Sequence, residues 1–171
     1  MASIKIKQHD ITDCGAACLA SISANYNLQI PIARIRQYAG TDKKGTNALG
    51  LIEAAEKLGF EAKGVRGELD SLFKIPKPAI AHIIVKEELQ HYIVIYEVTK
   101  TYIKIMDPGD GKIHKRTHEE FLKEWTGVLV LLLPKDEFTT GNEKVSVLKR
   151  FWFLLKPHKF VLLQALIGAV I

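Results

Sequence analysis

Apolar residues follow a helical period through the first third of the chain. This pattern predicts three helices, over residues 14–26, from Pro31 to Tyr38 and from Ala48 to Leu58. Asp13 and Asn47 precede two of these helices as typical N-caps, and Gly59 follows the third as a typical helix end. The chain is therefore expected to begin with a helical lobe.

The pattern then changes to short runs of β-branched and aromatic residues, separated by prolines and glycines. It predicts strands over 60–66, 79–85, 91–98, 101–106, 112–117 and 128–133, with short helices over 68–73 and 118–125. Helices that precede a mostly antiparallel sheet indicate an α+β fold. The polar residues 135–145 that follow are expected to be a linker.

The predicted strands 91–98 and 101–106 are joined by a tight turn near Thr99. If the hairpin is centred on Thr99, His91 lies opposite Asp107, and two isoleucine pairs follow on the same face. These apolar pairs indicate an inward face, which a slip of one residue would turn outward. The register therefore predicts an imidazole and a carboxylate side by side, with the carboxylate orienting the ring.

Cys14 lies at the start of the first predicted helix, where the positive end of the helix favours a thiolate. A nearby imidazolium favours it further, and the thiolate is the nucleophilic form. An oxyanion formed at an attacked carbonyl can accept hydrogen bonds from the Cys14 backbone and the Gln8 side-chain amide. Cys14, His91 and Asp107 are therefore candidate catalytic residues, and Gln8 is a candidate oxyanion donor.

Each of these residues taken alone has a commoner structural interpretation. A cysteine at a helix start is often a core residue, and a strand histidine is often only a packed or surface group. An aspartate before proline and glycine is often a turn former. The hypothesis of a thiol enzyme depends on the three occurring together.

The formal net charge of +5 is too scattered to predict binding to nucleic acid. Two cysteines on one helix form no disulfide framework, so reduced thiols on the cytoplasmic side are expected. Cys18 is expected to be a core thiol, and the dispersed histidines predict no metal site. The sequence has no Gly-x-x-x-x-Gly-Lys motif, so no ATP site of that kind is predicted.

The C-terminal part has a different composition. Phe160 to Ile171 carries no charge, and basic and aromatic residues precede it, as at a cytoplasmic membrane anchor. A membrane span needs roughly 20 apolar residues. Residues 146–171 are therefore predicted to be an interfacial helix followed by the truncated start of a first transmembrane helix. A buried C-terminal helix is the alternative.

A set of short motifs runs through the chain. It comprises Gln8, Asp13-Cys14-Gly15, Cys18, Gly45-Thr46-Asn47, Gly50-Leu51, Ala54-Ala55, Leu58-Gly59, His91 to Val94 and Asp107-Pro108. Together these motifs resemble the bacteriocin-processing cysteine peptidase domain at the N-terminus of peptidase-containing ABC transporters. The resemblance covers about residues 3–134, and no catalytic position departs from it.

The resemblance implies a papain-like cysteine peptidase domain over residues 1–134. Cys14 would be the nucleophile, His91 the general base and acid, Asp107 the orienting residue and Gln8 the oxyanion donor. Such domains cleave leader peptides after a double-glycine motif, and the transporter exports the released bacteriocin or pheromone peptide.

The resemblance also implies partners. The peptidase would be joined to membrane and ABC transporter domains of the same polypeptide, on the cytoplasmic side of the cell membrane, in a protein that is a homodimer at full length. The peptidase would need no cofactor, and ATP would bind a nucleotide-binding domain outside this sequence. An amphipathic leader helix would enter an apolar groove. The groove residues are not assigned, and Tyr92, Val94 and Tyr96 are weak candidates.

Two other functions remain open from the sequence. Related exporters carry a peptidase-like domain that only docks the leader, although such domains lack the cysteine that this chain has. Another papain-like acyl-transfer enzyme, such as a transglutaminase, would use the same three residues with an amine as acceptor.

Overall fold

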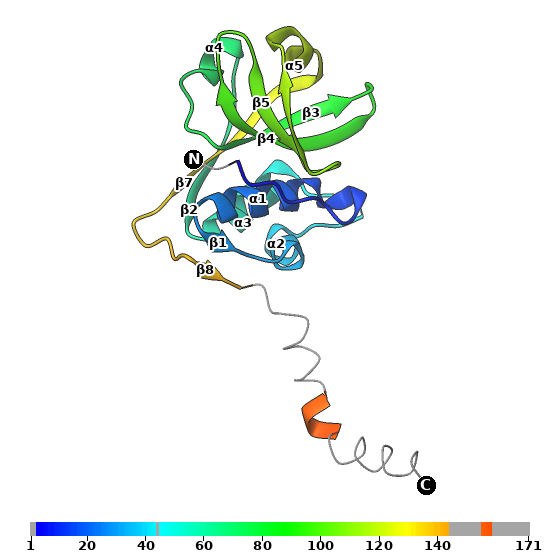
Figure 1. Cartoon of the computed structure of the whole chain (residues 1–171), viewed down its shortest axis with the longest axis vertical. Coiled ribbons are helices and arrows are strands. Elements are labelled where there is room, and N and C mark those ends of the chain that lie inside the picture. Colours follow the sequence, from blue (N-terminus) through cyan, green and yellow to red (C-terminus); the bar gives the residue numbers. More distant parts are fainter. Residues whose placement is uncertain (1–2, 44, 144–154, 159–171) are drawn as a thin grey trace.

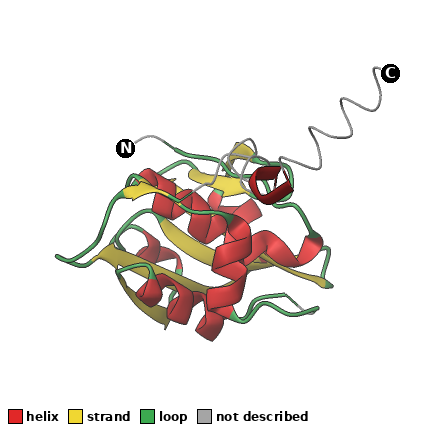
Figure 2. Cartoon of the chain, turned by 90° about the horizontal axis from the view of Figure 1, so that it is seen from below, coloured by secondary structure: helices red, strands yellow, loops and turns green. Residues whose placement is uncertain are grey.

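The computed structural model describes residues 3–43, 45–143 and 155–158 of the chain. The helical lobe contains α1 (Cys14–Asn25), α2 (Ile32–Ala39) and α3 (Ala48–Lys57). Figure 1 shows this lobe, in blue and cyan, below a sheet coloured mainly green, and Figure 2 shows helices in front of strands from below. The predicted α+β class is confirmed.

The main sheet has six strands. They are β2 (Phe60–Arg66), β3 (Ala79–Val85), β4 (Leu89–Val98), β5 (Ile103–Asp107), β6 (Lys112–Arg116) and β7 (Trp125–Pro134). Their order is β2-β7-β3-β4-β5-β6, and every neighbouring pair is antiparallel. The short helices α4 (Leu69–Leu72) and α5 (His118–Glu124) lie on the side of the sheet away from α1 (Figure 1).

Apolar side chains cover both faces of the sheet. Tyr92 and Val94 of β4 pack with the helical lobe, and Ile93 and Ile95 pack on the opposite face with residues of α4 and α5. Val94 is fully buried, so it cannot line an exposed leader groove, while Tyr92 and the half-buried Tyr96 pack against the lobe core. The continuous apolar run in β4 reflects this burial on both sides.

The helical lobe owes its close packing to small residues. All of α1 from Cys14 to Ala24 is buried, because glycine, alanine and serine let neighbouring elements approach. A Cβ atom added at Gly50 would lie 2.2 Å from the Ala39 carbonyl oxygen, so only glycine allows α3 to sit this close to the end of α2. The Asn47 side chain caps α3 by accepting a hydrogen bond from the Gly50 N–H at 2.7 Å.

The chain returns to the helical lobe after β7. The N–H of Lys135 donates to the Gly59 carbonyl at 3.0 Å, and the Phe138 ring lies 4.7 Å from the ring of Phe60. Two short strands, β1 (Leu28–Gln29) and β8 (Gly141–Asn142), then pair in parallel. The first part of the expected linker is therefore attached to the domain.

The predicted interfacial and transmembrane region, residues 146–171, lies outside the described residues except for 155–158. The 3₁₀ helix η2 (Lys156–His158) falls in this short stretch. In the part of the chain that the structure describes, no helix is long and apolar enough to cross a membrane.

Replacing Phe138 by alanine is expected to lower the free energy of unfolding by about 1–2 kcal/mol, because the ring is half-buried between Phe60 and Tyr26. Urea denaturation of the two proteins measures this difference. The exposed neighbour Glu137, replaced by alanine, is the control and should have little effect. Equal stability for the Phe138 variant would show that this segment contributes no packing energy.

Candidate functional site

His91 and Asp107 form a hydrogen-bonded pair. Nε2 of His91 lies 2.8 Å from Oδ1 of Asp107, and the same oxygen accepts a hydrogen bond from the Gly109 N–H at 2.8 Å. An ionised carboxylate can only accept, so Nε2 carries the proton in this contact. The pairing fixes the imidazole plane and leaves Nδ1 as the other functional nitrogen.

The hairpin that carries this pair has a different register from the predicted one. Ile95 pairs with Ile105, two residues from its predicted partner, and a β-bulge follows it. The turn is also longer, with residues 99–102 closed by hydrogen bonds. The predicted pairing of His91 directly opposite Asp107 was therefore wrong. A shift of two residues keeps each side chain on its face, so the two can still meet diagonally at the strand ends.

Cys14 meets the same imidazole from the helical lobe. It is the first residue of α1, and its side chain lies close enough to His91 to raise the pKa of the imidazole. Since Nε2 is taken by Asp107, Nδ1 is the nitrogen left for an interaction with the sulfur. Cys14 exposes 6% of its surface and His91 exposes 7%, so both residues are largely buried between the lobes. The structure thus brings the three predicted residues together across the two lobes.

The charges of the site stabilise one another. Burial by itself lowers the pKa of His91, but hydrogen bonds and charges from Asp107 and Cys14 outweigh it and raise that pKa to about 9. Burial likewise raises the pKa of Asp107, while the hydrogen bonds from His91 and the Gly109 N–H lower it overall. At neutral pH the pair is therefore an imidazolium and a carboxylate.

Gln8 lies beside the loop that follows Asp107. Its backbone N–H donates to the Pro108 carbonyl at 2.9 Å. Its side-chain oxygen Oε1 is buried and has no hydrogen-bond partner among the described residues. A buried polar atom without a partner is uncommon.

The arrangement places a thiol close to an imidazole that is hydrogen-bonded to a carboxylate, and comparison with known proteins fits this chemistry. The sequence model of the Peptidase C39 family matches residues 3–137. The chain belongs to the peptidase C39 family. It is 44% identical over 156 residues to the lactococcin-G-processing and transport ATP-binding protein LagD of Lactococcus lactis subsp. lactis. This match covers 90% of the chain but only 22% of LagD.

Solved structures of C39 domains share the fold. The peptidase domain of Streptococcus ComA, a bi-functional ABC transporter, matches with a TM-score of 0.74 and 38% identity over 78% of this chain and 100% of its own. A double glycine motif protease from an AMS/PCAT transporter, in complex with the leader peptide, matches with a TM-score of 0.71 and 34% identity. That match covers 77% of this chain and 91% of the other. The predicted papain-like fold and peptidase family are therefore confirmed.

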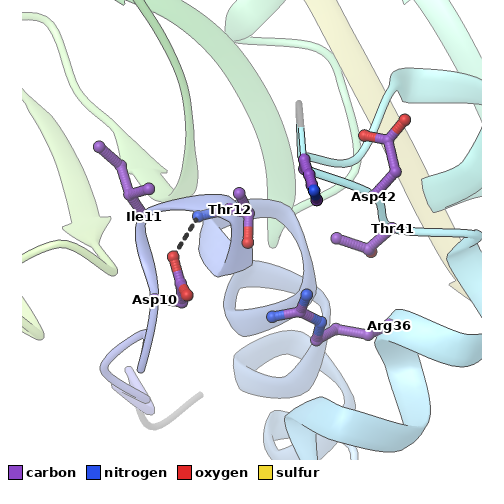
Figure 3. Close-up of a pocket in the computed structure, with 7 residues that line it drawn as sticks. Asp10, Ile11, Thr12, Arg36, Thr41 and Asp42 are labelled. Atoms are coloured by element: carbon purple, nitrogen blue, oxygen red, sulfur yellow. Dashed lines mark hydrogen bonds between the residues drawn. The ribbon is translucent and has the colours of Figure 1, made fainter.

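A pocket of about 520 Å³ opens beside the loop of residues 10–13 that leads into Cys14 (Figure 3). Its lining is Asp10, Ile11, Thr12, Arg36, Thr41, Asp42 and Lys43. In Figure 3 the Ile11 side chain points away from Arg36, and the Asp10 carboxylate accepts a hydrogen bond from the Thr12 N–H. The pocket carries both signs of charge, and Ile11, which is 65% exposed, adds an apolar side chain to its lining.

Sequence reasoning missed how this loop is held. Asp13 was expected to cap α1, but its side chain makes no cap hydrogen bond. The carboxylate is 3% exposed, accepts the Asp10 N–H at 3.1 Å and forms an ion pair with Arg36 of α2. It closes the 3₁₀ helix η1 (Ile11–Asp13) that immediately precedes Cys14. The only local signal was an aspartate next to the cysteine, and Arg36 could not be found from spacing.

The second cysteine of the C39 domain behaves as predicted. Cys18 is fully buried, and its pKa is raised by burial first and then by the nearby charges of Cys14 and Asp107. It therefore stays a neutral core thiol. Among the described residues, no group of three histidine, cysteine or acidic side chains is placed to hold a metal ion.

Proposed function

We propose that this chain is the peptidase domain of a longer exporter and cleaves the leader of a precursor peptide after two glycines. Cys14 is the nucleophile, His91 the general base and acid, and Asp107 the residue that orients the imidazole. The observation that carries the proposal is the hydrogen-bonded pair of His91 and Asp107 with the Cys14 side chain close to the imidazole. Membership of the peptidase C39 family supports it.

The proposed reaction proceeds in two stages. The Cys14 thiolate attacks the scissile carbonyl carbon and forms a C–S bond, and the oxyanion accepts hydrogen bonds from the Cys14 N–H and the Gln8 amide. The His91 imidazolium donates its proton to the leaving amine as the C–N bond breaks. A water then attacks the thioester while His91 takes its proton, and the C–S bond breaks to release the carboxylate and the free enzyme.

The burial of Cys14 and His91 supports a preference for glycine. Cys14 and His91 each expose less than a tenth of their surface, so a side chain next to the scissile bond would collide with the walls around them. A pair of glycines presents only backbone. The structural relative described as a double glycine motif protease in complex with a leader peptide favours the same substrate class.

The remaining parts of the proposal concern the whole protein. The relative LagD is a processing and transport ATP-binding protein of which this chain spans 22%, so we propose that membrane and ABC transporter domains follow in the same polypeptide. The peptidase would then act on the cytoplasmic side of the membrane within a homodimer and export a bacteriocin or pheromone peptide. The proposed cleavage uses only side chains and water, and ATP would be bound by the domains outside this sequence.

Cleavage of synthetic precursor peptides tests the proposal directly. A peptide with two glycines at the leader junction should be cut after the second glycine, with the position read by mass spectrometry. The matched peptide with valine in place of the second glycine should be cut poorly. Binding of the leader without any cut would instead indicate a docking module, and a product joined to an added amine would indicate acyl transfer.

The Gln8→Ala variant is expected to lower kcat by roughly 10² to 10³-fold, because the oxyanion would lose one of its two donors. Steady-state cleavage of the double-glycine peptide measures this change, and KM should move little. Gln37→Ala, which removes the same side chain from the exposed face of α2, is the matched control. A rise in KM with kcat unchanged would assign Gln8 to substrate binding instead.

A further inference from the structure

The first described residues form an extended segment that crosses both lobes, which we call the N-terminal strap (residues 4–8). The Tyr96 hydroxyl donates to the Ile4 carbonyl oxygen. The Ile6 N–H donates to Oγ of Ser21 at 3.1 Å, and the Gln8 N–H donates to the Pro108 carbonyl at 2.9 Å. Every second residue of the strap is thus tied to the domain by a hydrogen bond.

The three anchors come from the three elements that carry the site. Ser21 lies on α1, which begins at Cys14, and Tyr96 lies on β4, which carries His91. Pro108 directly follows Asp107. The strap therefore joins the elements of all three catalytic side chains and ends at the residue proposed to bind the oxyanion.

Ser21 is a polar residue at a fully buried position of α1, and its hydrogen bond to the strap accounts for the hydroxyl there. It is fully buried in α1, where serine has a poor helix propensity and an apolar residue would pack better. Its hydroxyl donates to the Ala17 carbonyl at 2.8 Å and accepts from the Ile6 N–H, so both functions of the oxygen are used. The spacing of Cys14, Cys18 and Ser21 places them along one helix face, with the strap beside it.

The strap also packs directly on the loop that follows Asp107. Gly111 has a φ of +71°, and a Cβ atom added there would lie 2.9 Å from Cβ of Lys7. This close approach leaves little freedom for Lys7, the neighbour of Gln8. The backbone that carries the Gln8 amide is therefore held from both sides, by the Ser21 hydroxyl before it and by this loop.

We propose that Ser21 and Tyr96 are positioning residues that hold the N-terminal strap so that the Gln8 amide stays directed at the oxyanion. The inference rests on the proposed function, in which Gln8 is an oxyanion donor. Neither residue touches the substrate; both act through the backbone of the strap. A small displacement of an oxyanion donor is costly, because its hydrogen bond forms at short range in the transition state.

The Ser21→Ala variant is expected to lower kcat for the double-glycine peptide about tenfold with KM nearly unchanged. Tyr96→Phe, which removes only a hydroxyl at the other end of the strap, should lower kcat in the same direction. The decisive measurement repeats both changes in the Gln8→Ala background. There each should alter kcat by less than about twofold, because the group that they position is gone.

Ser23→Ala is the matched control. Ser23 is equally buried on the same helix, but its Oγ has no hydrogen-bond partner among the described residues, so kcat should stay at the wild-type value. Thermal unfolding of every variant separates loss of fold from loss of rate.

Equal losses of kcat for Ser21→Ala with and without Gln8 would overturn the proposal, since they would show a general structural role. Unchanged kcat in both Ser21→Ala and Tyr96→Phe would overturn it as well. A wild-type protein that does not cut the peptide would refute the proposed function itself. If Gln8→Ala kept the wild-type kcat, the proposed peptidase function would still hold, but the strap would have no oxyanion donor to position.

Discussion

Cys14→Ala and His91→Ala should each lower kcat for the double-glycine peptide by about 10⁵-fold, and the double variant should be little worse than either single one. In the proposed reaction the sulfur is the only nucleophile, and the imidazole is the group that donates the proton to the leaving amine and takes the proton of water. The two side chains therefore act as one unit. The loss of transition-state stabilisation in the double variant is therefore not the sum of the losses in the two single variants.

Cys18→Ala is the control for Cys14→Ala. Both cysteines lie on α1 one turn apart, but Cys18 is fully buried and has a raised pKa. Its removal should change kcat only a few-fold and should lower stability by about 1 kcal/mol through the small cavity it leaves. Alkylation with iodoacetamide under native conditions should label one thiol in wild type and none in Cys14→Ala. Losses for Cys14→Ala and His91→Ala that multiplied in the double variant would contradict shared chemistry.

The secondary structure was largely predictable because local signals and tertiary packing agree. The bounds of β2 and β3 coincide with the predicted runs 60–66 and 79–85, since Gly59 and Gly67 flank the first run, Pro78 precedes the second, and β-branched residues dominate β3. The helix starts were also predictable, because Asn47 offers its side chain to the first turn of α3. The short strands β1 and β8 were missed, because two residues carry no periodicity and pair only through the fold.

The hairpin shows which part of a register a sequence determines. Alternation fixes the face on which a side chain lies, so His91 and Asp107 were correctly assigned to one face. It does not fix the pairing, because the β-bulge after Ile95 and the turn over 99–102 shift the strands by two residues. The assumption of a single inward face also failed, since helices cover both sides of the sheet. The prediction that these residues meet survived because a shift of two preserves the face.

The candidate site, too, was only partly predictable from the sequence. Residue type, chain order and the predicted hairpin selected Cys14, His91 and Asp107 as candidates, and His91 and Asp107 do form a hydrogen bond. The groups that hold the site were not predictable. Arg36 pairs with Asp13, and Ser21 binds the backbone of Ile6, through contacts that join distant segments and leave no pattern along the chain.

Asp107→Asn is the second large prediction, with an expected loss of about 10³ to 10⁴-fold in kcat. Asparagine keeps the size of the side chain but removes the negative charge that holds the imidazolium. The pKa of His91, about 9 in the wild type, should therefore fall. Wild-type activity requires the imidazolium and should decline as pH rises through about 9, and in Asp107→Asn this alkaline limit should lie at lower pH. A profile of kcat against pH measures both effects.

The same pKa shift predicts how stability depends on pH. His91 has a higher pKa in the folded protein than its ordinary value of 6.5, so its stabilising contribution is fully present below pH 6.5. This contribution is lost as pH rises from 6.5 through about 9, because the unfolded state loses the His91 proton near pH 6.5 and the folded state keeps it until about pH 9. The free energy of unfolding of the wild type should therefore fall across this window more steeply than that of Asp107→Asn.

Asp110→Asn provides the matched control for this variant. Asp110 also pairs with a histidine, His114, at 2.8 Å, but both side chains of that pair are more than a third exposed. Solvent screens such a surface pair, so its loss should change neither kcat nor the alkaline limit. If Asp107→Asn kept the wild-type limit near pH 9, the charge on His91 would have to be maintained by Cys14 alone. The acid would then orient the ring without setting its protonation, and the large loss in kcat should shrink accordingly.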